Sequence, residues 1–122
     1  MEKEIEINGI KYVPKSSIKQ NANAKMKKGM KYVICRTYSA GVFAGYLEKR
    51  TGKEVILREA RRLWYWEGAA SLSQLAVEGV KNPDKCKFPV AVDKVELMEA
   101  VEITDCTQEA KESIKAVDIW KK

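Results

Sequence analysis

The side chains best suited to binding a phosphorylated ligand are gathered in one short stretch. Arg58, Arg61 and Arg62 lie within five positions of one another. A guanidinium group binds a phosphate through two parallel hydrogen bonds and also stacks on flat rings, so we expect these three side chains to contact phosphates. Arg36 is a further candidate for the same role.

Aromatic side chains accompany these arginines. Trp64 and Trp66 flank Tyr65, so in a strand the two tryptophans point to the face opposite Tyr65. Core packing or a subunit contact is one interpretation of these rings. The other is that Trp64, Trp66 or Phe43 stacks on a base or forms the wall of a pocket, and the neighbouring arginines favour it.

Two segments of small residues could hold an anion through main-chain groups. Ser39, Ala40 and Gly41 stand between two expected strands, where small side chains leave N–H groups accessible. A tight connection between strands explains the same residues. Ser71 opens an expected helix, where it could help to bind an anion or simply cap the helix together with Gln74. Both alternatives stay open at this point.

The composition excludes several kinds of catalysis. The chain has no histidine, which removes Ser-His-Asp and Cys-His catalysis and histidine-based zinc sites. Its three cysteines, Cys35, Cys86 and Cys106, lack metal-ligand spacing, so we expect buried thiols in a reducing cytoplasm. Glu59 and Glu67 could serve as an acid or base, but neither has an evident nucleophile or paired carboxylate. We therefore expect a binding protein, not an enzyme, with no cofactor and no metal.

Charge is unevenly distributed along the 122 residues, whose net charge is +6. The first third is basic, and we expect residues 1–29 to form a hairpin over 4–13 followed by a polar, basic arm. Residues 30–122 should form the compact domain that carries the ligand site and the oligomer interface. No apolar run approaches the ~20 residues that a membrane span needs, and the charged start is not typical of a signal peptide. A cytoplasmic protein without membrane contact is expected.

The elements that must position these side chains follow from hydrophobic periodicity. Strands are expected over 30–39, 42–50 and 54–66, one or two more over 89–104, and short helices within 68–79 and from Thr107 onward. We expect a bulge near residues 59–61 and a slip in alternation near 98–100. The fold class is α+β: one domain with an antiparallel β-sheet of hairpins or a meander, and two short helices late in the chain.

Residues 30–120 resemble a family of small phage-encoded proteins. The resemblance is carried by YVICRTYSAGVFAGYL (32–47), by ARRLWYWEGAASLSQLAVEG (60–79), and by NPDKCKF followed later by DCTQEA and a C-terminal Trp. It covers most of the chain and leaves out the basic arm. The family is similar to the Thoeris anti-defence proteins, phage sponges that sequester the nucleotide signals of bacterial immunity.

The resemblance implies a ligand and an assembly. The ligand would be a glycocyclic ADP-ribose made by a TIR-domain enzyme, with the cyclic trinucleotides of CBASS defence as a second class. The protein would be a homo-oligomer, a hexamer built of dimers with pockets at subunit interfaces, in the cytoplasm of the infected bacterial host. A sponge binds its ligand without cleaving it.

Two other functions remain open. A nucleic-acid-binding phage accessory protein would use the basic arm and the arginine- and tryptophan-rich strand on single-stranded DNA or RNA, with a steep salt dependence. A structural or assembly protein would bind no small molecule. For the leading hypothesis, replacing Arg61 and Arg62 with alanine is predicted to abolish ligand binding and to leave the oligomer folded.

Overall fold

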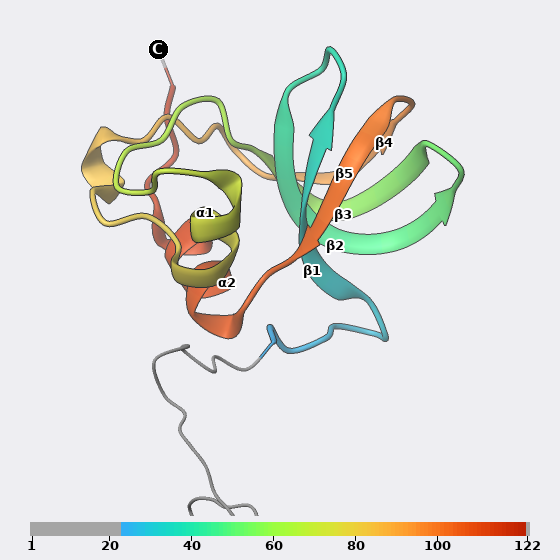
Figure 1. Ribbon diagram of the computed structural model, residues 1–122, viewed down its shortest axis with the longest axis horizontal. Helices are drawn as coiled ribbons and strands as arrows, with labels where there is room; N and C mark the ends of the chain where they lie inside the picture. The colour runs from blue at the N-terminus through green and yellow to red at the C-terminus, as the bar shows by residue number, and fades with distance from the viewer. Residues whose placement is uncertain (1–22, 122) are drawn as a thin grey trace, which may run out of the picture.

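Five strands and two short α-helices make up the part of the chain that the computed structural model describes, residues 23–121. They are β1 (Lys31–Thr37), β2 (Val42–Thr51), β3 (Glu54–Arg62), α1 (Leu72–Glu78), β4 (Val92–Leu97), β5 (Ala100–Asp105) and α2 (Gln108–Ala116), with a 3₁₀ helix, η1 (Pro83–Lys85), before β4. Figure 1 shows the helices together on one side of the sheet. The predicted α+β domain is confirmed, whereas the hairpin expected over residues 4–13 lies outside the described residues.

The sheet is curled because its two edge strands are consecutive in the sequence. The strand order is β4-β3-β2-β1-β5, and every neighbouring pair is antiparallel. β4 ends at Leu97 and β5 begins at Ala100, so only Met98 and Glu99 connect the opposite edges. Successive Cα atoms are about 3.8 Å apart, so these two strand ends must lie close together. The slip predicted near residues 98–100 is this connection.

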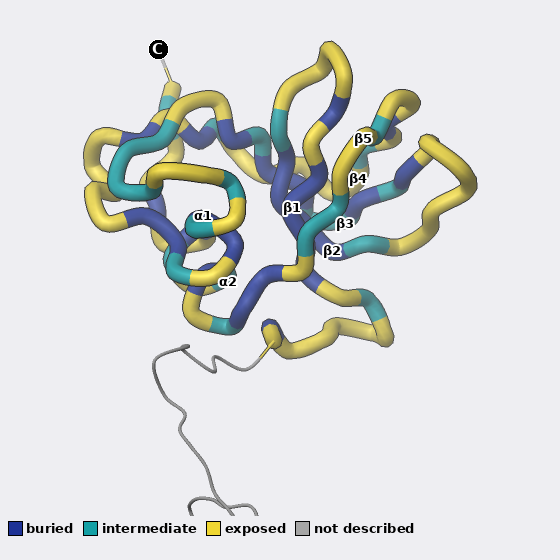
Figure 2. The backbone as a smooth tube through the Cα atoms, in the orientation of Figure 1, coloured by how far each residue is buried: buried dark blue, intermediate teal, exposed yellow. Residues whose placement is uncertain are grey.

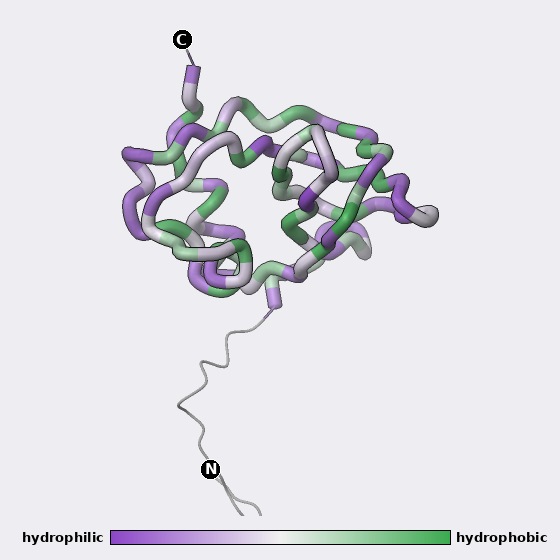
Figure 3. Tube along the Cα trace, turned by 45° about the horizontal axis from the view of Figure 1, so that its top comes forward, coloured by the Kyte–Doolittle hydropathy of each residue, from purple (hydrophilic) through white to green (hydrophobic). Residues whose placement is uncertain are grey.

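The curl and the helices together bury both faces of the sheet. In β1, Tyr32 and Ile34 pack in a core between the sheet and the helices, whereas Val33 and Cys35 pack in a second core on the inner side of the curl. In Figure 2 the buried residues, in dark blue, lie along the strands where the sheet passes between the helices and the inner side of the curl. Hydrophobic and hydrophilic residues alternate in short stretches along the chain (Figure 3). This alternation lets one strand contribute to two cores.

A bulge interrupts β3 where the sequence predicts one. The register places Glu59 and Ala60 opposite the single residue Gly45 of β2. Glu59 has a φ of 50°, in the left-handed region that residues other than glycine rarely adopt. The extra residue shifts the alternation by one position, so Leu57 and Ala60 both face the inner core while Arg61 faces the helices. The bulge therefore decides which side chains of β3 reach α2.

Both helices begin where the sequence predicts. The Ser71 hydroxyl accepts a hydrogen bond from the N–H of Gln74 (3.1 Å), and Gly79, with a φ of 76°, ends α1. The Thr107 hydroxyl accepts from the N–H of Ala110 (3.0 Å) at the start of α2. The two helices pack against each other over the outer face of the sheet. Within residues 23–121, none of the helices has the length and apolar character that a membrane span requires.

The end of β3 differs from the sequence prediction. The strand expected over residues 54–66 ends at Arg62, and beyond it Tyr65 forms an isolated bridge with Lys87. Before β4, η1 begins at Pro83, whose fixed φ suits the first position of a helix.

Residues 23–29 lie against the domain, although the sequence places them in the polar arm. The N–H of Ala24 donates to the carbonyl oxygen of Cys106 (2.9 Å), and the N–H of Lys25 donates to the side chain of Gln108 (2.8 Å). Ala24 is buried. These contacts join the segment to the start of α2, a pairing between distant residues that local composition does not encode.

Candidate anion-binding site

Arg61 is buried and connects separate segments of the fold through hydrogen bonds. Its side chain is 6% exposed, and its guanidinium donates four hydrogen bonds to main-chain carbonyl oxygens, those of Phe88 (3.0 Å), Pro89 (2.9 Å), Ile114 (2.8 Å) and Val117 (2.6 Å). Two of these carbonyls lie at the C-terminal end of α2, where the helix dipole favours a cation. Arg61 therefore ties α2 to the segment before β4, and these donors are directed at the main chain.

Arg62 lies against the connection between β1 and β2. Its guanidinium stands 4.4 Å from the centre of the Phe43 ring and donates a hydrogen bond to the carbonyl oxygen of Ala40. Gly41 has a φ of 102°, and a Cβ added there would lie 3.4 Å from the same guanidinium. The N–H of Ala40 donates to the Thr37 hydroxyl (2.9 Å). The structure thus brings together four predicted site residues, Ala40, Gly41, Phe43 and Arg62. The polar groups of Ala40 and Arg62 form hydrogen bonds within this loop.

Arg36 and Ser39 have carboxylate partners near β5. Arg36 pairs with Glu102 across the β1–β5 ladder (2.9 Å), and the Ser39 hydroxyl donates to Glu99 (3.0 Å). Both contacts are exposed, and an exposed ion pair such as Arg36–Glu102 contributes only about 0–1 kcal/mol to stability.

The predicted aromatic and capping residues are spread out. Trp64 is 63% exposed, whereas Trp66 is half-buried against the core beneath the helices. The Ser71 hydroxyl is occupied as the cap of α1, as one of the two open interpretations expects.

Replacing Ser71 with alanine tests this capping role. The change removes the acceptor for the N–H of Gln74, and the loss of such a cap costs about 1 kcal/mol. Urea denaturation of S71A should therefore show a lower midpoint with an unchanged slope. A variant as stable as the wild type would contradict the capping role.

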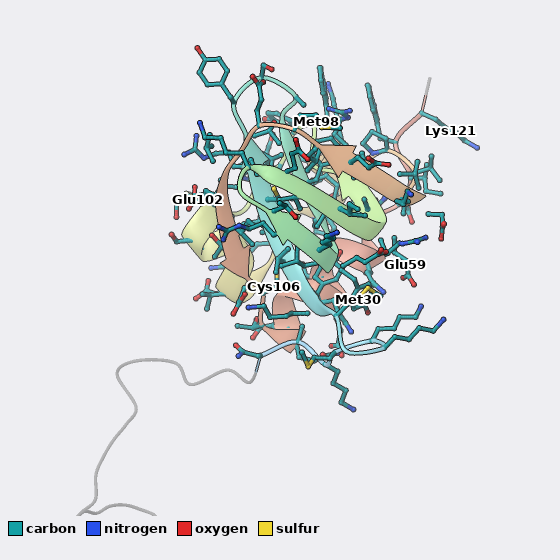
Figure 4. The ribbon with its side chains drawn as sticks, turned by 90° about the vertical axis from the view of Figure 1, so that its right-hand side faces the viewer. Met30, Glu59, Met98, Glu102, Cys106 and Lys121 are labelled. Carbon is teal, nitrogen blue, oxygen red and sulfur yellow. The ribbon has the colours of Figure 1, made fainter. Side chains whose placement is uncertain are left out.

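Two open pockets lie beside β3 and share Glu59 in their linings, and we call them together the trench. The polar pocket, of about 460 Å³, is lined by Lys27, Lys28, Met30, Glu48, Arg58, Glu59 and Asp93. The second pocket, of about 340 Å³, has a more apolar wall and is lined by Tyr32, Glu59, Arg61, Val90, Ala91, Lys115, Val117 and Ile119. In Figure 4, Glu59 and Met30 lie on one side of the domain and Glu102 on the other. The trench therefore joins a charged half to a half that offers apolar contact.

Three ammonium groups surround the buried Tyr46 ring, and we call Lys27, Lys111 and Lys115 the lysine cluster. Of these, Lys27 and Lys115 line the trench. Their Nζ atoms lie 5.8, 5.4 and 5.0 Å from the centre of the Tyr46 ring. Lys111 and Lys115 also donate to the Tyr46 hydroxyl, at 3.1 and 3.4 Å. Burial by itself would raise the pKa of the Tyr46 phenol, but the hydrogen bonds from Lys111 and Lys115, together with the charges of these two lysines, outweigh it and the pKa is lowered. The cluster is thus a strongly positive environment.

Local geometry brings the lysine cluster together. Lys27 and Met30 exchange two main-chain hydrogen bonds around Lys28 and Gly29, whose φ angles of 52° and 79° are those of a two-residue type I′ turn. This turn presents Lys27 to the sheet. Lys111 and Lys115 are four residues apart in α2 and therefore lie on one face of that helix.

Glu59 supplies the carboxylate that the lysine cluster contacts. Its side chain pairs with Lys27 and, through Oε1, with Lys115 at 3.4 Å. The hydrogen bond from Lys27 lowers the pKa of the Glu59 carboxyl, against a smaller opposing effect of burial. Arg58 and Arg61 are the two predicted phosphate contacts that line the trench, and Arg58 pairs with Glu48 and with Asp93 (3.0 Å). A cationic surface with internal counterions of this kind is suited to binding an anion.

The sequence does not identify the lysine cluster. Lys27 reads as part of a solvated arm, and the two lysines of α2 stand in an acidic segment. Two signals were present: the Lys28-Gly29 pair, which suits a tight turn, and the four-residue spacing of Lys111 and Lys115. The predicted bulge is a third signal, because bulges are common next to functional sites.

The cysteines are buried thiols, as expected. Burial raises the pKa of the Cys106 thiol to about 12, so this sulfur is protonated and unreactive at neutral pH. Across residues 23–121 no cluster of cysteine, aspartate or glutamate side chains has an arrangement that could hold a metal ion.

Fold and site together define a small α+β domain with a curled five-stranded sheet and a cationic trench beside β3. Residues 30–114 match the model of the domain of unknown function DUF6948, and the chain belongs to this family. No curated protein and no solved structure matches the chain. The matched region includes β1 to β5 and most of α2, and both Lys27 and Lys115 lie outside it.

Proposed function

We propose that this protein binds a cyclic nucleotide immune signal in the trench and sequesters it without cleaving it. The proposed ligand is a glycocyclic ADP-ribose, with a cyclic trinucleotide as a second class, in the cytoplasm of a phage-infected bacterium. This proposal joins the resemblance to the Thoeris anti-defence proteins with the chemistry of the trench.

The observation that carries the proposal is the placement of the lysine cluster beside a partly apolar pocket. Nucleotide phosphates need cations, and Lys27 and Lys115 flank the position of Glu59. A base or ribose needs apolar contact, and Val90 and Ile119, 57% and 54% exposed, line the adjoining pocket. Both halves of such a ligand therefore find matching surfaces within one trench.

Tight sequestration requires more burial than an open trench offers. A nanomolar Kd corresponds to about 12 kcal/mol, and small molecules reach such values when most of their surface is enclosed. We propose that a second copy of the chain covers the trench, in a homo-oligomer assembled as a hexamer built of dimers.

A calorimetric titration with glycocyclic ADP-ribose and with a cyclic trinucleotide tests the function. We expect nanomolar binding of at least one ligand. After heat denaturation of the complex, mass spectrometry should recover the ligand at its original mass. Recovery of a cleaved product would make the protein an enzyme and contradict sequestration.

The same titration with single-stranded oligonucleotides addresses the nucleic-acid alternative. An affinity that grows with strand length and falls steeply with salt would favour an accessory protein of nucleic acid and contradict the sponge. Absence of binding to every ligand would leave a structural or assembly role.

A further inference from the structure

Glu59 contacts two members of the lysine cluster, Lys27 and Lys115, from an unusual backbone conformation. Its two carboxylate oxygens contact ammonium groups from different elements, Lys27 before β1 and Lys115 on α2. Its φ of 50° lies in a region that costs a residue with a Cβ about 1 kcal/mol or more. The carboxylate is thus presented to the lysines from a bulge held by the flanking strands.

The Tyr46 hydroxyl has one hydrogen-bonding position left for an anion. A hydroxyl has two lone pairs and one proton. Lys111 and Lys115 donate to its oxygen at 3.1 and 3.4 Å, which uses the two lone pairs. Within residues 23–121 no hydrogen bond uses the proton, which is therefore available to an acceptor. An oxyanion beside the cluster would therefore meet an O–H donor as well as ammonium groups.

We propose that the lysine cluster and the Tyr46 hydroxyl form a phosphate subsite, and that the Glu59 carboxylate fills this subsite until a ligand phosphate displaces it. The proposal rests on the proposed function in assigning the phosphate to a sequestered nucleotide. The subsite itself requires only the chemistry of a phosphate. Glu59 is then an internal competitor of the ligand.

A ligand phosphate can replace the Glu59 carboxylate because the two anions resemble each other. A carboxylate and a phosphodiester each present two equivalent oxygens that share one negative charge. A phosphodiester placed between Lys27 and Lys115 accepts the donors that Glu59 accepts in the free protein. Displaced Glu59 moves into solvent, and only exposed ion pairs are lost, each worth little by itself. Removing the charge of Glu59 therefore strengthens binding of the incoming anion.

Calorimetric titration of the full chain with inorganic pyrophosphate tests the subsite. We expect Glu59→Gln to bind pyrophosphate about three- to tenfold more tightly than the wild type at low ionic strength, because a competing charge beside the anion is gone. Glu102→Gln is the matched control. It also removes one carboxylate from an exposed ion pair, with Arg36, on the other side of the domain (Figure 4). Its affinity should stay within about twofold of the wild type.

Equal affinities for the Glu59→Gln and Glu102→Gln variants would overturn the proposal, as would the absence of pyrophosphate binding in all proteins. Tyr46→Phe provides an independent readout, because it keeps the buried ring and removes only the hydroxyl. Pyrophosphate binding by Y46F should be several-fold weaker, with an unchanged circular dichroism spectrum; full affinity would remove the hydroxyl from the subsite. A second arm with glycocyclic ADP-ribose separates the two proposals. Pyrophosphate binding without nucleotide binding contradicts the proposed function and supports the subsite.

Discussion

Replacing Arg61 with methionine is expected to lower the free energy of unfolding by about 3–5 kcal/mol, a large share of the stability of a domain this size. The side chain is buried and donates hydrogen bonds to four main-chain carbonyl oxygens. Methionine fills similar space but donates none of these bonds. The buried acceptors would then lose their partners, and each such loss costs about 1–3 kcal/mol before water relieves part of it. α2 would also lose the cation at its C-terminal end.

Two further variants separate the hydrogen-bond geometry from the charge. Arg61→Lys keeps the charge, but an ammonium group cannot match the planar guanidinium, so an intermediate loss is expected. Arg50→Met removes an exposed guanidinium that donates to the nearby carbonyl oxygen of Gly52 (3.0 Å), and should change stability by less than about 0.5 kcal/mol. The measurement is urea denaturation at one fixed protein concentration, since oligomer formation would add to stability. An R61M variant as stable as R50M would contradict the structural role of Arg61.

Because Arg61 is expected to stabilise the fold, the double substitution of Arg61 and Arg62 does not test ligand binding alone. The sequence predicts that the pair binds ligand and that its replacement leaves the oligomer folded. In the structure only Arg62 is half-exposed, and its guanidinium lies on Phe43 beside the β1–β2 connection. Loss of binding in the double variant would therefore report on stability as much as on ligand contact. Single substitution of Arg62 is the informative experiment at that loop.

The parts of the fold that the sequence predicts well are those determined by neighbouring residues. The cap at Ser71, the helix stop at Gly79 and the alternation along β1 each depend on a few adjacent side chains. The bulge at Glu59 was also predictable, because a run with helical propensity interrupts a strand pattern. Even the connection at Met98 and Glu99 appears in the sequence, as a slip in alternation.

The candidate site was less predictable because it depends on distant pairings. Arg58, Arg61 and Arg62 are close in sequence, and no local pattern distinguishes them. The shift in alternation at the bulge nevertheless places their side chains in different surroundings. Arg61 becomes a buried tie to α2, which no local pattern indicates. The lysine cluster forms only because the segment before β1 pairs with the start of α2, so residues from both ends of the domain meet. Neither contact has a signature in composition or periodicity.

Replacing both Lys27 and Lys115 with methionine is expected to weaken binding of glycocyclic ADP-ribose by about 100-fold or more. A hydrogen bond between a cation and an anion is worth about 1.5–3 kcal/mol, so each lysine that contacts the phosphate contributes about tenfold or more. Methionine keeps most of the apolar stem that lies over the tyrosine rings, so packing is largely preserved. The exposed pairs with Glu59 contribute little to stability, and the variant should remain folded.

A matched control separates contact at the trench from the effect of overall charge. Lys53→Met combined with Lys85→Met removes the same two charges from exposed positions in the β2–β3 turn and in η1, neither of which lines the trench. At 0.15 M salt the Debye length is about 8 Å, so distant charges are screened and this control should bind within about threefold of the wild type. Calorimetry on the wild type and the two double variants, with circular dichroism to verify folding, distinguishes contact at the trench from an effect of overall charge. Equal losses in both double variants would mean that only net charge attracts the ligand, and the trench would then not be its binding site.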